Sequence, residues 1–146
     1  MFGRLLQSLG FRRGEGSDRS LERYERLSQE NRATVRDTYL RENFSHDPSE
    51  QLVQNALRLW REGQRLEALE VFSRAIKQTP ENSILLLNRA NLNVELGNFN
   101  EALSDFERAR TGQPRLPEQV FAMQEALQSM SPATLEILVQ KRKNAH

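Results

Sequence analysis

The middle of the chain carries apolar residues at the three- and four-residue spacing of amphipathic helices. One such segment runs from about Glu50 to Glu62 and ends at Gly63, a residue that accepts the positive φ of a helix stop. A second runs from about Arg65 to Gln78. It stops before Pro80, because the residue preceding a proline is pushed out of helical backbone angles. The pattern predicts two consecutive helices joined by a short turn.

The same order of elements then occurs again. A helix is predicted from about Ser83 to Leu96, Gly97 closes it, and a further helix extends to Arg110. The stretches "DPSE" (47–50) and "NFNE" (98–101) each place a capping residue three positions ahead of a glutamate. Both stretches therefore predict helix N-termini, with Asp47 and Asn98 as the N-caps.

An internal repeat explains this recurrence, because a shift of 34 residues superposes identical side chains. Small residues and a phenylalanine recur at fixed positions, as expected where two helices approach to about 8–10 Å. The matched pairs are Ala56 with Ala90, Gly63 with Gly97, Ala68 with Ala102, Phe72 with Phe106, Ala75 with Ala109, and Pro80 with Pro114.

The period of 34, the Ala-x3-Phe-x2-Ala pattern, the inner glycine and the closing proline resemble the tetratricopeptide repeat (TPR). The resemblance covers about half of the chain, with repeats at about 49–82 and 83–116 inside a segment 47–116. Asn55 and Arg65 depart from the family pattern, which usually has large apolar or aromatic residues there. The resemblance implies an all-α fold, a short superhelix of stacked helical hairpins.

The resemblance also implies a concave groove, lined by the first helix of each repeat, that binds a peptide or helix of a partner. Either a partner or another part of this chain could cover the apolar groove residues. Trp60 stands out because tryptophan is enriched among binding hot spots, although it also caps cores. The expected groove residues are Val53, Leu57, Trp60, Ile84, Leu87, Asn88, Asn91 and Val94.

One subclass of the family grips the C-terminal carboxylate of chaperones with basic and amide side chains. Asn88 matches one of those positions, but Val53 and Leu57 occupy the Lys and Asn positions of the first repeat. Glu118 and Ala122 occupy the basic positions of the third helix, so a buried carboxylate would lack its charge-assisted partners. We therefore do not expect a carboxylate clamp.

The C-terminal segment 117–146 reads as a degenerate repeat followed by a capping helix. "LPEQVFAMQEALQSM" has helical apolar spacing without the alanine and glycine marks of the repeat. A last helix is predicted with Ser131 as its N-cap and Pro132 as its first residue. We expect both helices to cover the open end of the array, and the basic "KRK" at 141–143 to be a solvated tail.

The segment 18–46 predicts one polar helix over about 20–42, with a thin apolar stripe that strengthens after Val35. We expect it to dock firmly only in its last turns, as a cap on the first repeat. A helix for partner binding or dimerisation is the alternative.

Residues 1–17 combine a short basic amphipathic start, 1–13, with all but the last residue of the joint "GEGSD" at 14–18. Phe2, Leu5, Leu6 and Leu9 share one face, and the start has three arginines and no acid. Its alternatives are a self-docked start, a membrane or partner anchor and an organellar targeting segment. It has no continuous apolar run or small-x-small site, so we expect no secretory signal.

Composition narrows the classes of function further. The 21 basic and 20 acidic residues nearly cancel, which gives no indication of a nucleic-acid partner. Cysteine is absent, so thiolate metal sites and cysteine nucleophiles are excluded, and a cytoplasmic location fits. His46 and His146 have no ligand partner at helical spacing, and no phosphate-binding glycine loop occurs. We expect no enzyme activity, no metal and no cofactor.

The sequence as a whole predicts a non-enzymatic module for protein–protein interaction, such as an adaptor, scaffold or assembly factor. A peripheral membrane protein anchored by residues 1–13 and a self-associating homo-oligomer are the alternatives.

Overall fold

The computed structural model describes residues 19–31 and 50–144, and the regular secondary structure of this part is helical apart from one isolated bridge between Asn82 and Gln113. The expectations for the amphipathic start, for Asp47, for the helix after Val35 and for both histidines concern residues outside these ranges. After a helix at 19–31, the elements are α3 (Glu50–Arg61), α4 (Arg65–Gln78), α5 (Ser83–Leu96), α6 (Phe99–Arg110), the 3₁₀ helix η3 (Glu118–Phe121), α7 (Ala122–Gln128) and α8 (Pro132–Asn144).

The four central helices begin and end almost where the sequence predicts. The predicted bounds of α4 and α5 are confirmed, and α3 ends one residue before the expected Glu62. Gly63 and Gly97 have φ of 82° and 81°, so each ends its helix in the left-handed conformation that glycine adopts without strain.

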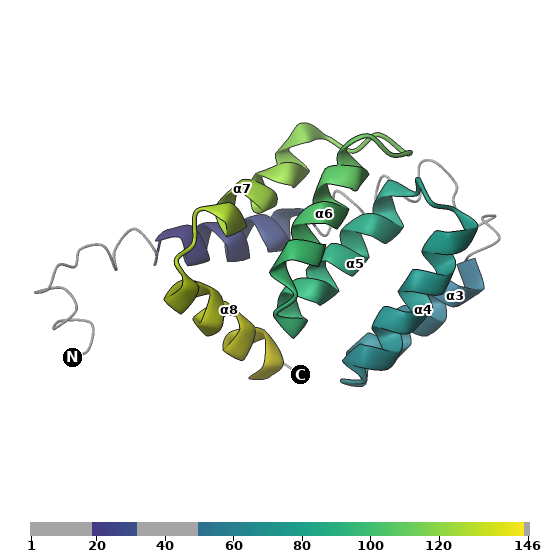
Figure 1. Ribbon diagram of the computed structural model, residues 1–146, viewed down its shortest axis with the longest axis horizontal. Helices are drawn as coiled ribbons and strands as arrows, with labels where there is room; N and C mark the ends of the chain where they lie inside the picture. The colour runs from purple at the N-terminus through teal and green to yellow at the C-terminus, as the bar shows by residue number, and fades with distance from the viewer. Residues whose placement is uncertain (1–18, 32–49, 145–146) are drawn as a thin grey trace, which may run out of the picture.

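Helix α5 is the centre of the packing. It contacts α4, α6 and α8, and α3 packs against α4 (Figure 1). Its sequence is apolar around much of its circumference, as expected of a helix enclosed by neighbours. The alanines and phenylalanines of the repeat pattern are all fully buried between these helices: Ala56, Ala68, Phe72, Ala75, Ala90, Ala102, Phe106 and Ala109.

The segment after α6 contacts the loop before α5 through backbone hydrogen bonds. Gln113 donates its N–H to Glu81 O at 2.8 Å, and Ser83 donates its N–H to Gln113 O at 2.9 Å. Gly112 lies at this contact, where a Cβ would clash with the Glu81 carbonyl. Pro114 is buried here, whereas Pro80 is exposed.

The capping predictions have mixed outcomes. Ser131 Oγ accepts the N–H of Thr134 at 3.2 Å, which confirms it as the cap of α8. Asn98 precedes α6 as predicted, but its side chain makes no capping bond and donates instead to Asn93 Oδ1 at 3.0 Å. The unpredicted cap is Asn82, whose Oδ1 accepts from the N–H groups of Ile84 and Leu85.

The C-terminal segment contains three elements, η3, α7 and α8. The predicted single helix after Pro117 is a 3₁₀ turn followed by the short α7. Helix α8 turns back and contacts α5 (Figure 1). The chain thus returns to the middle of the molecule after Pro132.

The prediction that the N-terminal helix docks only in its last turns is wrong for the turns that the structure describes. Leu21 and Tyr24 are buried and belong to the main hydrophobic core, and Leu27 packs against it. Three apolar residues at spacing three are enough to dock this helix, because one side of each turn faces α5, α7 or α8 while the other side is solvated.

Candidate functional site

The eight predicted groove residues define what we call the partner face of α3 and α5. On α5, Ile84, Leu87 and Val94 are buried, while Asn88 and Asn91 are half-buried. On α3, Val53 is buried, whereas Leu57 and Trp60 remain half-buried. The apolar side chains of this face are therefore largely covered within the chain itself, which is the alternative that the sequence left open.

Helix 19–31 supplies part of this cover. Tyr24 donates its hydroxyl to Asn91 Oδ1 at 3.3 Å, and its side chain is only 2% exposed. Burial raises the pKa of the Tyr24 phenol above its ordinary value, and the nearby Arg142 partly opposes this rise. Asn91, predicted as a groove residue, thus binds a neutral tyrosine of the same chain.

The far end of helix 19–31 is held by the C-terminal elements. Asn31 Nδ2 donates to the carbonyl oxygen of Val120 at 3.0 Å, and the Asn31 side chain is buried. At its first turns, Ser20 and Ser129 share a hydrogen bond of 3.0 Å, and Arg23 lies 3.6 Å from Glu125.

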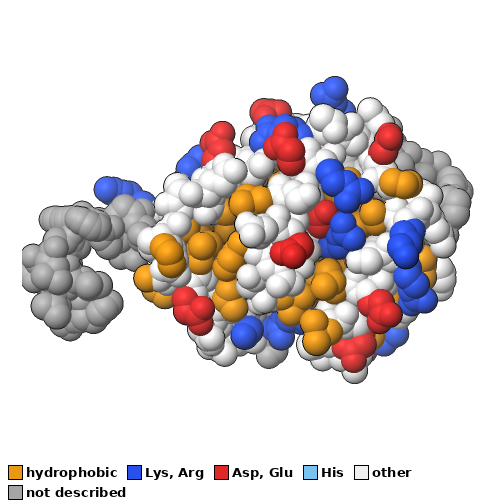
Figure 2. All heavy atoms as spheres, viewed as in Figure 1, with side chains coloured by type: hydrophobic (Ala, Val, Ile, Leu, Met, Phe, Trp, Pro, Cys, Tyr) orange, Lys and Arg blue, Asp and Glu red, His pale blue; other side chains and the backbone are white. Residues whose placement is uncertain are grey.

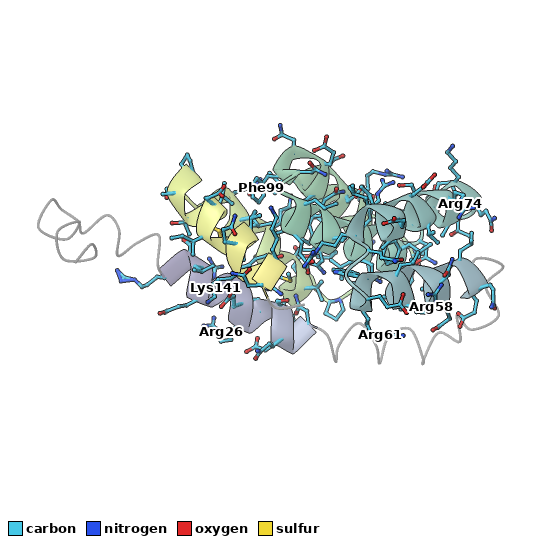
Figure 3. The ribbon with its side chains drawn as sticks, turned by 90° about the horizontal axis from the view of Figure 1, so that it is seen from below. Arg26, Arg58, Arg61, Arg74, Phe99 and Lys141 are labelled. Atoms are coloured by element: carbon cyan, nitrogen blue, oxygen red, sulfur yellow. The ribbon has the colours of Figure 1, made fainter. Side chains whose placement is uncertain are left out.

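Helix α8 lies along helix 19–31, with Lys141 at their contact (Figure 3). Lys141 Nζ donates to Glu25 Oε1 at 3.2 Å, and the Arg142 guanidinium lies 5.5 Å from the centre of the Tyr24 ring. The prediction of a solvated basic tail is therefore wrong for Arg142, which is half-buried over the Tyr24 ring, whereas Lys141 is exposed and pairs with Glu25.

A buried carboxylate joins the two helix pairs at the edge of the partner face. Glu95 Oε1 accepts from Trp60 Nε1 at 3.0 Å and from Arg65 Nε at 2.9 Å. The Trp60 ring also stands edge-on to Phe72, with the ring centres 6.0 Å apart. Trp60 is thus engaged in contacts between helices of the chain.

Arg65 also binds the end of α8. Its Nη2 donates to the carbonyl oxygens of Arg142 and Lys143, at 3.3 and 3.2 Å. These carbonyls carry the negative end of the helix dipole, which a guanidinium stabilises. Arg65 thus connects α4, α5 and α8.

Sequence reasoning missed Glu95, although one signal for it exists. Glu95 is an acid in the last turn of α5, a turn without a basic residue, where the helix dipole disfavours a negative charge. Such a position indicates that a cation from another element holds the carboxylate.

A second ion pair outside the partner face was also missed. Arg89 donates from Nε and Nη2 to the two oxygens of the buried Asp105, at 2.8 and 2.9 Å, and from Nη1 to Ser73 Oγ. The hydrogen bond to Asp105 raises the pKa of Arg89. The signal was the register of Asp105, which lies on the same side of α6 as Ala102 and Ala109.

The remaining Asn88 binds its own helix, because its Nδ2 donates to Ile84 O at 3.0 Å. Among residues 19–31 and 50–144, no group of three or more His, Cys, Asp or Glu side chains could hold a metal ion. In the same ranges every fully buried side-chain nitrogen or oxygen has a hydrogen-bond partner. No helix of the described part is long and apolar enough to cross a membrane.

The face of the molecule seen in Figure 2 mixes charged, polar and apolar side chains. Arg58, one of the exposed bases of α3, pairs with Glu62 at 3.2 Å (Figure 3). Two large apolar side chains of the described part are well exposed, Leu66 at 70% and Ile137 at 45%.

The chain was compared with protein-family models, with curated proteins and with solved structures, and none of the three matches it.

Proposed function

We propose that this chain is a TPR-type, non-enzymatic module that binds a helix of another protein on its partner face. Repetition supports the repeat assignment: several pairs of residues 34 positions apart share the same burial or the same backbone conformation. Ala68 and Ala102 are both fully buried, as are Phe72 and Phe106, and Gly63 and Gly97 share one backbone conformation.

One observation carries the binding part of the proposal: an amphipathic helix of the chain itself contacts the partner face at Asn91. Tyr24 reaches Asn91 from that helix, and Leu21 and Leu27 join the same core. A face that accommodates a helix with two leucines and a tyrosine hydroxyl has the chemistry to accept a similar helix from another protein.

The side chains of this face favour binding over catalysis. They are apolar groups, an indole and amides, and none of these gains or loses a proton near neutral pH. Amides offer both a donor and an acceptor, and they suit a ligand with hydroxyl or backbone groups. We place the module in the cytoplasm, consistent with its lack of cysteine.

Photo-crosslinking in lysate of the source organism tests the proposal. A benzophenone amino acid is placed at Leu57 or at Asn88, both half-buried on the partner face, and at the exposed Glu70 of α4 as the matched control. We expect a protein adduct from the first two positions that position 70 does not give. Identical adducts from all three positions, or none from Leu57 and Asn88, would contradict the proposed function.

A further inference from the structure

Helix 19–31 has one narrow face that binds the rest of the molecule. Leu21, Tyr24, Leu27 and Asn31 lie along it at spacings of three, three and four, and all four are buried or half-buried. The opposite side of the helix is exposed; it carries Arg26, which points away from the molecule (Figure 3). The helix therefore contacts its neighbours in the manner of a docked helical ligand.

Its polar contacts reach α5, η3, α7 and α8, the elements on one side of the molecule. Meanwhile α3 packs against α4, α4 against α5, and α5 against α6. These contacts among the four helices are separate from those of helix 19–31, so they remain available to hold the two helix pairs together when that helix leaves the partner face.

Two exposed ion pairs help to hold the helix in place. Lys141 and Glu25 have side chains 53% and 31% exposed, and Arg23 and Glu125 are 42% and 69% exposed. Pairs of this exposure bind weakly and are screened by salt. These two ion pairs therefore make the contact selective in its charges and add little to its strength, to which the buried Leu21, Tyr24 and Asn31 contribute.

Charge also defines what can replace the helix. Lys141 and Arg142 of α8 face this helix. Arg142 lies over the ring of Tyr24, and Lys141 pairs with Glu25, the next residue in the sequence. A replacement helix needs an aromatic hydroxyl for Asn91 and an acid next to it for Lys141. A cation at the position of Glu25 would be repelled by Lys141.

We propose that helix 19–31 is an internal occupant of the partner face, and that the partner is an amphipathic helix of the same chemistry that displaces it. Such a helix carries the pattern Leu-x-x-Tyr-acid-x-Leu, as residues 21 to 27 do here. This inference rests on the proposed function, because it specifies the partner and the regulation of the same face.

A peptide exchange experiment on the full chain tests this. The probe is a fluorescein-labelled, end-capped peptide of residues 19–31, and its binding is followed by fluorescence anisotropy. A Leu21→Ala, Tyr24→Ala chain, with a weakened internal occupant, should bind the peptide at least about tenfold more tightly than the wild type. The matched control, Glu22→Ala, Arg26→Ala, changes only exposed residues of this helix and should bind like the wild type. Equal affinity of all three chains would overturn the inference.

A charge reversal repeats the test without altering the core. Glu25→Lys places a cation beside Lys141 and Arg142, and it should raise peptide affinity a few-fold. Adding Lys141→Glu re-forms an ion pair with reversed signs and should return affinity to the wild-type value. No change in either chain would contradict the displacement.

The crosslinking experiment separates the two proposals. If the Asn88 adduct forms equally in the wild-type and Glu25→Lys chains, the internal occupant is wrong and the proposed function stands. If the adduct is stronger with Glu25→Lys, both are supported. If neither chain gives an adduct, the proposed function fails, and the displacement by a partner fails with it.

Discussion

Trp60 of α3 donates its indole N–H to Glu95 of α5 over 3.0 Å, and Arg65 donates to the same carboxylate oxygen. We expect Arg65→Ala to lower the free energy of unfolding by about 1.5–3 kcal/mol, because a charged hydrogen bond to a buried carboxylate is lost. The bonds from Arg65 to the last carbonyls of α8 are lost as well. Urea unfolding followed by circular dichroism measures the change.

The matched control is Arg58→Ala, since Arg58 and Glu62 form an ion pair with side chains 52% and 50% exposed. Its loss should be below about 0.5 kcal/mol. Equal losses from Arg65→Ala and Arg58→Ala would show that the Glu95 cluster contributes nothing special to stability.

Overpacking of the helix interface provides the second prediction. Ala109 of α6 is fully buried, so Ala109→Leu should lower the free energy of unfolding by about 1–3 kcal/mol. Ala133→Leu places the same side chain on an exposed position of α8 and should leave the thermal midpoint nearly unchanged. A midpoint for Ala109→Leu that matches the wild type would mean that the repeat is in the wrong register.

Alanine substitutions at Gly63 and Gly112 test two different effects, backbone strain at the first position and a steric clash at the second. Gly63 has φ of 82°, and no atom of a neighbouring residue lies within 4 Å of the place a Cβ would take. Gly63→Ala should therefore cost only the left-handed conformation, about 1–2 kcal/mol. Gly112→Ala drives a methyl group into the Glu81 carbonyl and must shift the loop before α5. We expect the larger loss of thermal stability from Gly112→Ala, and the reverse order would contradict the close contact between the two loops.

Alkaline pH should destabilise the protein through Tyr24. The pKa of this buried phenol is raised in the folded state, whereas in the unfolded chain it ionises near pH 10. Above about pH 10 the unfolded state therefore binds fewer protons, and the free energy of unfolding falls as the pH rises. Thermal unfolding at pH 8 and pH 10.5 should show a larger fall for the wild type than for Tyr24→Phe, which has no phenol to ionise. Parallel falls would show that Tyr24 is not the titrating group.

Local sequence determined the helices and their turns. Gly63, Gly97 and Pro80 act within a few residues of their own position, so the bounds of α4 and α5 could be read directly. The burial of Phe72 and Phe106 followed from the spacing of the alanines around them. The surroundings of the partner face depend on contacts between residues far apart in sequence, and the local sequence pattern does not reveal such contacts.

Glu25 and Lys141 illustrate the limit. Each is a polar residue on a helix with a thin apolar stripe, and nothing near either residue in the sequence indicates that they pair at 3.2 Å. Glu95 and Asp105 were missed for the same reason, because their arginine partners come from other helices. The occupied state of the partner face could be named as an alternative, but the sequence could not identify its occupant.

The contacts between the first and last described helices have a consequence for folding. Ser20 and Ser129 are 109 residues apart in sequence, and Glu25 and Lys141 are 116 apart. In an open repeat array each unit touches only its neighbours, so stability is a sum of local terms and the ends can fray independently. Here the two ends contact each other and α5, so loss of one terminal helix removes contacts of the other.

Such distant pairings raise the contact order, which slows folding relative to helical proteins with mostly local contacts. We therefore expect one cooperative unfolding transition, and folding whose rate is limited by the closure of the chain ends.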